Sequence, residues 1–152
     1  MENWQGFLIL IYGLIGFYGA YKGYRKSRYE NKRLELSPHF IVYGAFVWAD
    51  VVIFGIFWFL FSLVCIILND WILFLLSQSL FWLIRGFGET IYWFNQQFST
   101  ISRSSHKDFP FSRFFGNDDY TVWFVMQIFM QCITVVSAIL SLYFGKLWLG
   151  TF

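Results

Sequence analysis

The chain has 152 residues, of which 58% are hydrophobic, 25% are aromatic and only 13% are charged. A soluble domain has roughly 25% charged residues, so this composition argues against a water-soluble globular fold. The charges are also clustered and leave long apolar stretches, which predicts an all-α, polytopic membrane protein with four transmembrane helices.

The first predicted span covers about residues 4–22. It begins beside Met1 and has neither a basic n-region nor a small-residue cleavage site, so we expect a retained span and not a removed signal peptide. Small residues recur about every third position and favour close approach of another helix, although scattered glycines are also tolerated in many membrane helices. These helix-packing candidates are Gly13, Gly16, Gly19, Ala20 and Gly23.

A basic loop, 22–39, follows the first span. Its interleaved tyrosines could suggest RNA binding, but beside a membrane span the positive charge is explained more simply by topology and by anionic lipid headgroups. We therefore expect lipid contact and no nucleic acid. The candidate headgroup ligands are Lys22, Arg25, Lys26, Arg28, Lys32 and Arg33.

Three more spans are predicted, at about 40–68, 71–94 and 120–145, with a tight turn at Asn69–Asp70 and a second basic loop at 99–119. The second span is expected to start near Ser37, and it is longer than the ~20 residues that cross a bilayer. We expect the four spans to form one domain over residues 1–152.

Loop charge predicts the orientation. Six of the 11 basic residues lie in the first basic loop and three in the second, whereas the turn at Asn69–Asp70 has none. The positive-inside rule places both basic loops on the cytoplasmic or matrix side, so both termini are expected on the non-cytoplasmic side. The membrane is expected to be a bacterial cytoplasmic membrane or a mitochondrial inner membrane. Phe and Trp, with 21 and 8 residues, also favour an AT-rich or organelle genome.

Polar residues interrupt the third and fourth spans at helical spacing. Steps of three and four residues place them on one face of each helix, so they form polar seams. The seam of the third span contains Gln78, Arg85, Glu89, Tyr92 and Gln96, and that of the fourth contains Gln127, Gln131, Thr134 and Ser141.

Residue counts from the turn at Asn69–Asp70 place Asp50 near the polar seam of the third span. Asp50 precedes Asn69 by 19 residues, while Arg85 and Glu89 follow it by 16 and 20. In an antiparallel hairpin these positions lie within about one helical turn of depth, which predicts an intramembrane cluster of Asp50, Arg85 and Glu89. The cluster could be a buried ion pair that fixes helix register, a proton or ion path, or a contact with a partner subunit.

The sequence contains no recognisable catalytic motif. There is no G-x-S-x-G, no HExxH and no glycine-rich phosphate loop, and His39 and His106 lie near loops. Cys65 and Cys132 lie in apolar segments at different expected depths, which predicts two free, buried thiols. We therefore expect no enzyme activity, no metal and no cofactor.

Of three functions considered, a membrane enzyme is the least favoured, and two others remain. The first is a non-catalytic accessory or structural subunit of a larger membrane complex, in an energy-transducing or respiratory membrane of bacterial or mitochondrial type. The alternative is a homo-oligomeric ion or proton channel or transporter that uses the cluster of Asp50, Arg85 and Glu89. The expected partners are accordingly the bilayer itself and either other membrane subunits or copies of the same chain.

Overall fold

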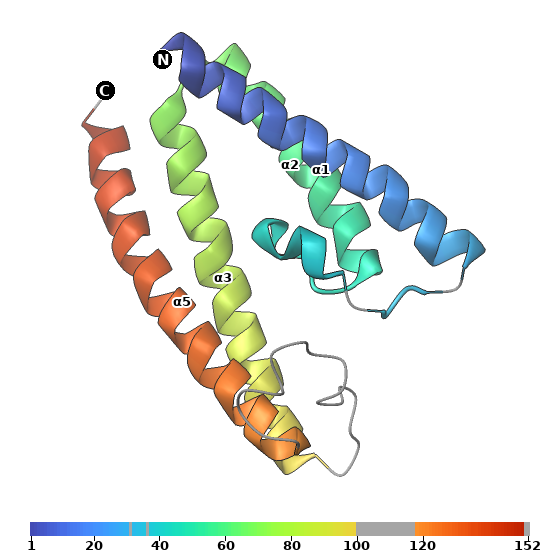
Figure 1. The fold of residues 1–152 in the computed structure, drawn as a ribbon. Helices are drawn as coiled ribbons and strands as arrows, with labels where there is room; N and C mark the ends of the chain where they lie inside the picture. The colour runs from blue at the N-terminus through green and yellow to red at the C-terminus, as the bar shows by residue number, and fades with distance from the viewer. Residues whose placement is uncertain (31, 36, 100–117, 151–152) are drawn as a thin grey trace. The chain divides into compact units, whose positions relative to one another are not determined.

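The computed structural model describes residues 1–30, 32–35, 37–99 and 118–150. The regular elements in these ranges are helices (Figure 1). The elements are α1 (Asn3–Tyr29), the short 3₁₀ helix η1 (Pro38–Tyr43), α2 (Trp48–Ile67), α3 (Trp71–Phe98) and α5 (Asp119–Leu149).

Four of the described helices, α1, α2, α3 and α5, are long and apolar enough to cross a membrane. This confirms the prediction of an all-helical chain with four apolar segments. The chain divides into two compact units, residues 1–75 and 76–152. The first unit contains α1, η1, α2 and the start of α3, and the second contains the rest of α3 and α5.

The second apolar helix begins later than the predicted start at residue 40. Residues 38–43 form the 3₁₀ helix η1, which ends at Gly44 in the left-handed conformation, with φ of 72°. Glycine adopts this conformation without the steric cost that a Cβ would impose. The chain then runs extended through Val47, and α2 starts at Trp48 and has 20 residues.

The first basic segment is more helical than predicted. Helix α1 continues to Tyr29, so Lys22, Arg25, Lys26 and Arg28 lie on its last two turns and not in a loop. Lys and Arg are good helix formers, and a basic side chain near a helix C-terminus is favoured by the helix dipole. Lys26 Nζ also lies 2.7 Å from Glu30 Oε2, and this hydrogen bond lowers the pKa of Glu30.

Helices α1 and α2 pack antiparallel through small residues. A Cβ on Gly23 would lie 3.0 Å from the carbonyl oxygen of Trp48, and one on Gly16 would lie 3.1 Å from that of Gly55. Gly13 faces Ser62 in the same way, one further step along both helices. All three α1 glycines are buried. The small-residue face of α1 is therefore the surface on which α2 lies.

The segment that contains η1 folds back along α1. Phe40 contacts Gly19, and Tyr43 stacks on Tyr12 with ring centroids 4.4 Å apart. The Tyr43 hydroxyl donates to the carbonyl oxygen of Tyr12 over 2.7 Å. Tyr12 is 11 residues from Gly23, which corresponds to about 16 Å along a helix. The segment thus reaches the middle of α1 before the chain returns to begin α2.

Backbone hydrogen bonds hold this returning segment closed. The Ser37 N–H donates to the Phe46 carbonyl over 2.8 Å, and the Gly44 N–H donates to that of Ile41 over 2.7 Å. At its base, the Trp48 N–H donates to the Glu35 carbonyl over 3.3 Å. Irregular backbone within an apolar environment is tolerated where its polar groups are satisfied in this way.

Replacement of Tyr43 by Phe tests the contact with α1. Tyr43 is 5% exposed. Tyr43→Phe is expected to lower the free energy of unfolding by about 1 kcal/mol, because the hydrogen bond from the Tyr43 hydroxyl to the Tyr12 carbonyl is lost.

Unfolding of the detergent-solubilised protein with SDS would measure this effect. The unfolding midpoint of Tyr43→Phe should lie at a lower SDS fraction than that of wild type. Equal midpoints in the two proteins would show that the Tyr43 hydroxyl does not stabilise the contact with α1.

Both described cysteines are free, but only one is buried. Cys65 is buried against Ile9 and Phe74, whereas Cys132 is exposed. The expectation that both thiols are buried is therefore wrong for Cys132. The buried positions of α5 on either side of it are Met130 and Ser137, and Cys132 lies on a different face of the helix.

In the second unit, α3 and α5 lie side by side and antiparallel (Figure 1). Gln97 Nε2 donates to Gln127 Oε1 over 2.6 Å near one end of the pair. Towards the other end, a Cβ on Gly145 would lie 3.8 Å from Leu76. Asp118 caps the start of α5 by accepting the Thr121 N–H over 2.8 Å.

Candidate functional site

The strongest polar feature of α3 is an ion pair within the helix. Arg85 Nη2 lies 2.8 Å from Glu89 Oε1, and the two side chains are 24% and 11% exposed. They are four residues apart, so both lie on the same side of the helix. Each side chain carries the charge that compensates the other. The pair therefore lowers the cost of placing either charge in an apolar segment.

The predicted seam of α3 only partly coincides with its buried face. Glu89 and Gln96 are buried, whereas Gln78, Arg85 and Tyr92 are half-buried. The buried line of the helix runs through Ser79, Gly86, Glu89, Trp93 and Gln96. The polar seam is thus turned slightly away from the most buried line, and the two meet at Glu89 and Gln96.

The residues of the predicted α5 seam differ in how far they are buried. Gln127 is half-buried and bonds to α3 through Gln97, whereas Gln131 is exposed. The hydroxyls of Thr134 and Ser141 donate to carbonyls one turn earlier, over 2.8 and 2.7 Å. A hydroxyl that bonds its own helix in this way uses its donor locally and does not bridge to a neighbouring helix.

Two positions that join α3 to α5 were not among the predicted site residues. A Cβ on Gly86 would lie only 2.8 Å from Thr134 Oγ1, so Gly86 permits the close approach of the two helices. Gln97 follows the seam residue Gln96 and therefore lies off the seam's three- and four-residue spacing. The long connection between the helices conceals their register in the sequence. Both ends contain glutamines, but the sequence does not determine that Gln97 is the one that bonds to Gln127.

Asp50 lies in the first turn of α2 and not in the middle of a helix. Its Oδ2 accepts the backbone N–H of Phe46 over 3.4 Å. A carboxylate in the first turn also interacts favourably with the helix dipole. Asp50 belongs to the first unit and Arg85 to the second, so their predicted pairing, and the share of Glu89 in it, stays a prediction.

The six predicted headgroup ligands have distinct surroundings. Lys26 pairs with Glu30, and Lys32 Nζ lies 3.2 Å from Glu35. Lys22 lies over the Trp48 ring, 5.7 Å from its centroid. Arg25 lines a hollow with Lys22, Lys26 and Glu30. Arg28 and Arg33 instead line a separate pocket, and each makes a hydrogen bond to α1.

No group of three or more His, Cys, Asp or Glu side chains in the described ranges could hold a metal ion. His106 and the second basic loop lie outside the described residues. The chain matches no protein-family model, no curated protein and no solved structure.

Proposed function

We propose that the protein is an integral membrane protein that serves as a non-catalytic accessory or structural subunit of a larger membrane complex. The observation that carries the proposal is the Arg85–Glu89 pair, which is largely buried and joins two side chains of one helix. Charges that compensate each other over 2.8 Å hold side chains in place and keep a helix compatible with an apolar environment.

The surfaces of the helices support the same proposal. The described helices carry many exposed large apolar and aromatic side chains, among them Phe17, Ile84, Phe87 and Phe129. Such a surface requires lipid or other membrane helices around it. Nearly all described residues lie in the four long helices and the short returning segment, so the surface offered to partners is that of the helices themselves.

The alternative is a homo-oligomeric channel or transporter. It is favoured by buried polar groups in α3, namely Glu89, Gln96 and the Nε2 group of Gln78, which is buried without a hydrogen-bond partner. A buried amide without a partner costs about 1–3 kcal/mol, and a water file would remove that cost.

Expression of the chain alone distinguishes these functions. A subunit is expected to be degraded or to aggregate without its partners and to conduct nothing in liposomes. A channel is expected to form a symmetric oligomer and to pass protons or cations, with loss of flux in Glu89→Gln. Flux through purified wild-type protein that Glu89→Gln abolishes would overturn the subunit proposal.

The proposed orientation has both termini on the non-cytoplasmic side, in a bacterial cytoplasmic or mitochondrial inner membrane. The basic end of α1 would then lie at the cytoplasmic or matrix surface. A reporter that is active only on the cytoplasmic side, fused to Phe152, is expected to be inactive. Activity of that fusion would reverse the orientation.

A further inference from the structure

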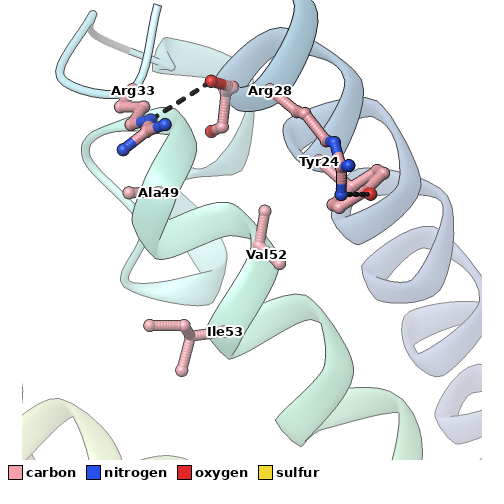
Figure 2. A pocket seen from close by; sticks show the side chains of 7 residues that line it. Tyr24, Arg28, Arg33, Ala49, Val52 and Ile53 are labelled. Carbon is pink, nitrogen blue, oxygen red and sulfur yellow. Dashed lines mark hydrogen bonds between the residues drawn. The ribbon is translucent and has the colours of Figure 1, made fainter. Parts of the chain in front are cut away.

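A pocket lies between the basic end of α1 and the start of α2. It has a volume of about 420 Å³ and is lined by Tyr24, Ser27, Arg28, Arg33, Ala49, Val52 and Ile53. Two of these seven side chains are guanidinium groups and none is acidic. Figure 2 shows Arg28 and Arg33 on opposite sides of the pocket, with Val52 of α2 facing the space between them.

Both arginines are held in place without being neutralised. Arg28 Nη1 donates to the Tyr24 hydroxyl over 2.7 Å, and its guanidinium lies 5.7 Å from the centre of that ring (Figure 2). Arg33 Nε donates to the Ser27 carbonyl over 3.3 Å. Within the described residues neither forms an ion pair, in contrast to Lys26 and Lys32. Because a guanidinium has five N–H donors, each retains several for a ligand.

Ser27 provides a further polar group. Its Oγ is buried and has no hydrogen-bond partner, and the residue lines the same pocket. A buried hydroxyl without a partner is destabilising, so a ligand oxygen that reached it would remove that cost. Two guanidinium groups and a hydroxyl are the donors expected around a phosphate, since arginine matches the geometry of phosphate oxygens.

The α2 side of the pocket indicates which phosphate compound it binds. Val52 is half-buried and Ile53 is 65% exposed, so an apolar surface leads out of the pocket along α2. A free phosphate ion would gain nothing from that surface, whereas the glycerol and acyl chains of a phospholipid would cover it. The pocket also lies where the basic end of α1 meets the start of α2, the level at which lipid headgroups are expected.

We propose that this pocket is a specific site for one anionic phospholipid, whose phosphate lies between Arg28 and Arg33 and whose acyl chains lie over Val52 and Ile53. The site is distinct from the general attraction of the basic segment for an anionic membrane. It does not depend on whether the chain is a subunit or a channel.

The test compares arginines that differ only in their place. The full chain, purified and delipidated in mild detergent, is titrated with phosphatidylglycerol, and native mass spectrometry measures the affinity for the first bound lipid. Arg28→Gln and Arg33→Gln are each expected to weaken it by about tenfold or more, as for loss of a charged hydrogen-bonding partner. Arg25→Gln removes the same charge one turn away and is expected to change the affinity by less than about twofold.

Further measurements separate the possible sources of phosphate. Phosphatidylcholine should bind weakly, and millimolar inorganic phosphate should not displace phosphatidylglycerol. Displacement by inorganic phosphate would show that the pocket binds phosphate and is not a phospholipid site. An equal effect of Arg25→Gln and Arg28→Gln would show only diffuse attraction, which also overturns the proposal.

A further variant tests the same pocket in case the arginine variants misfold. Ile53→Glu leaves both arginines in place and puts a carboxylate at an exposed position of the same pocket. It should abolish binding of the first phosphatidylglycerol while the helical content and unfolding midpoint remain those of wild type. Undiminished binding by a folded Ile53→Glu protein would contradict the proposal.

Discussion

Gly55→Ala is expected to destabilise the first unit by about 2 kcal/mol, although it adds a single methyl group. A Cβ at Gly55 would meet the carbonyl oxygen of Gly16 and lie 3.0 Å from both the backbone nitrogen and the Cβ of Ala20. Backbone atoms of a helix cannot turn aside as the end of a flexible side chain can. The two helices would therefore have to separate along the face on which they pack.

The matched control is Gly88→Ala. Gly88 also lies inside a long helix, but a Cβ there would meet nothing within 4 Å. Alanine is the better helix former, so this change is expected to be neutral or stabilising by up to about 1 kcal/mol. Unfolding in SDS, followed by tryptophan fluorescence, compares the two variants. Equal midpoints for Gly55→Ala and Gly88→Ala would show that the glycine face does not hold α1 against α2.

Glu89→Gln is expected to lower the free energy of unfolding by about 3 kcal/mol, because it removes the negative charge that lies 2.8 Å from Arg85 in a largely apolar segment. The double variant Arg85→Gln/Glu89→Gln removes both charges and is expected to recover most of that loss. Glu30→Gln breaks the exposed pair with Lys26 and should change stability little. If the two losses at Arg85 and Glu89 simply add in the double variant, the side chains do not stabilise one another.

The same design tests the predicted pairing of Asp50 with Arg85. Asp50→Asn should destabilise the protein and should be coupled to Arg85→Gln by more than about 0.5 kcal/mol in a double-mutant cycle. Independent effects would assign Asp50 to its local role at the start of α2, where it accepts the Phe46 N–H.

Helix content and the small-residue face were accessible from the sequence because each depends on a local pattern. Charge-free apolar runs predict long helices, and the spacing of Gly13, Gly16 and Gly19 marks a face that another helix can approach. The pattern in α1 does not show that Gly55 of α2 is the residue at the contact. The break at Gly44 was missed because residues 40–47 are as apolar as a span, and only the backbone conformation separates η1 from α2.

For the polar residues of α3 and α5, helical spacing predicted only part of the observed contacts. Spacing placed Arg85 and Glu89 on one side of α3, where they form an ion pair. It could not predict that Gln131 is exposed while Gln127 is bonded to Gln97, because the register between α3 and α5 depends on a long connection. In the same way, charge alone grouped six basic residues, whereas the fold separates Arg28 and Arg33 from the others by placing them in one pocket with α2.

The proposal that this chain is a subunit is tested most directly by extracting it from its native membrane. A tagged chain would be solubilised in two mild detergents, separated by native electrophoresis and analysed by mass spectrometry of the intact assembly. The expected result is one particle much larger than 18.2 kDa, in which other membrane proteins are present at the same fixed stoichiometry in both detergents. A particle made only of copies of this chain would contradict the proposal and favour the channel.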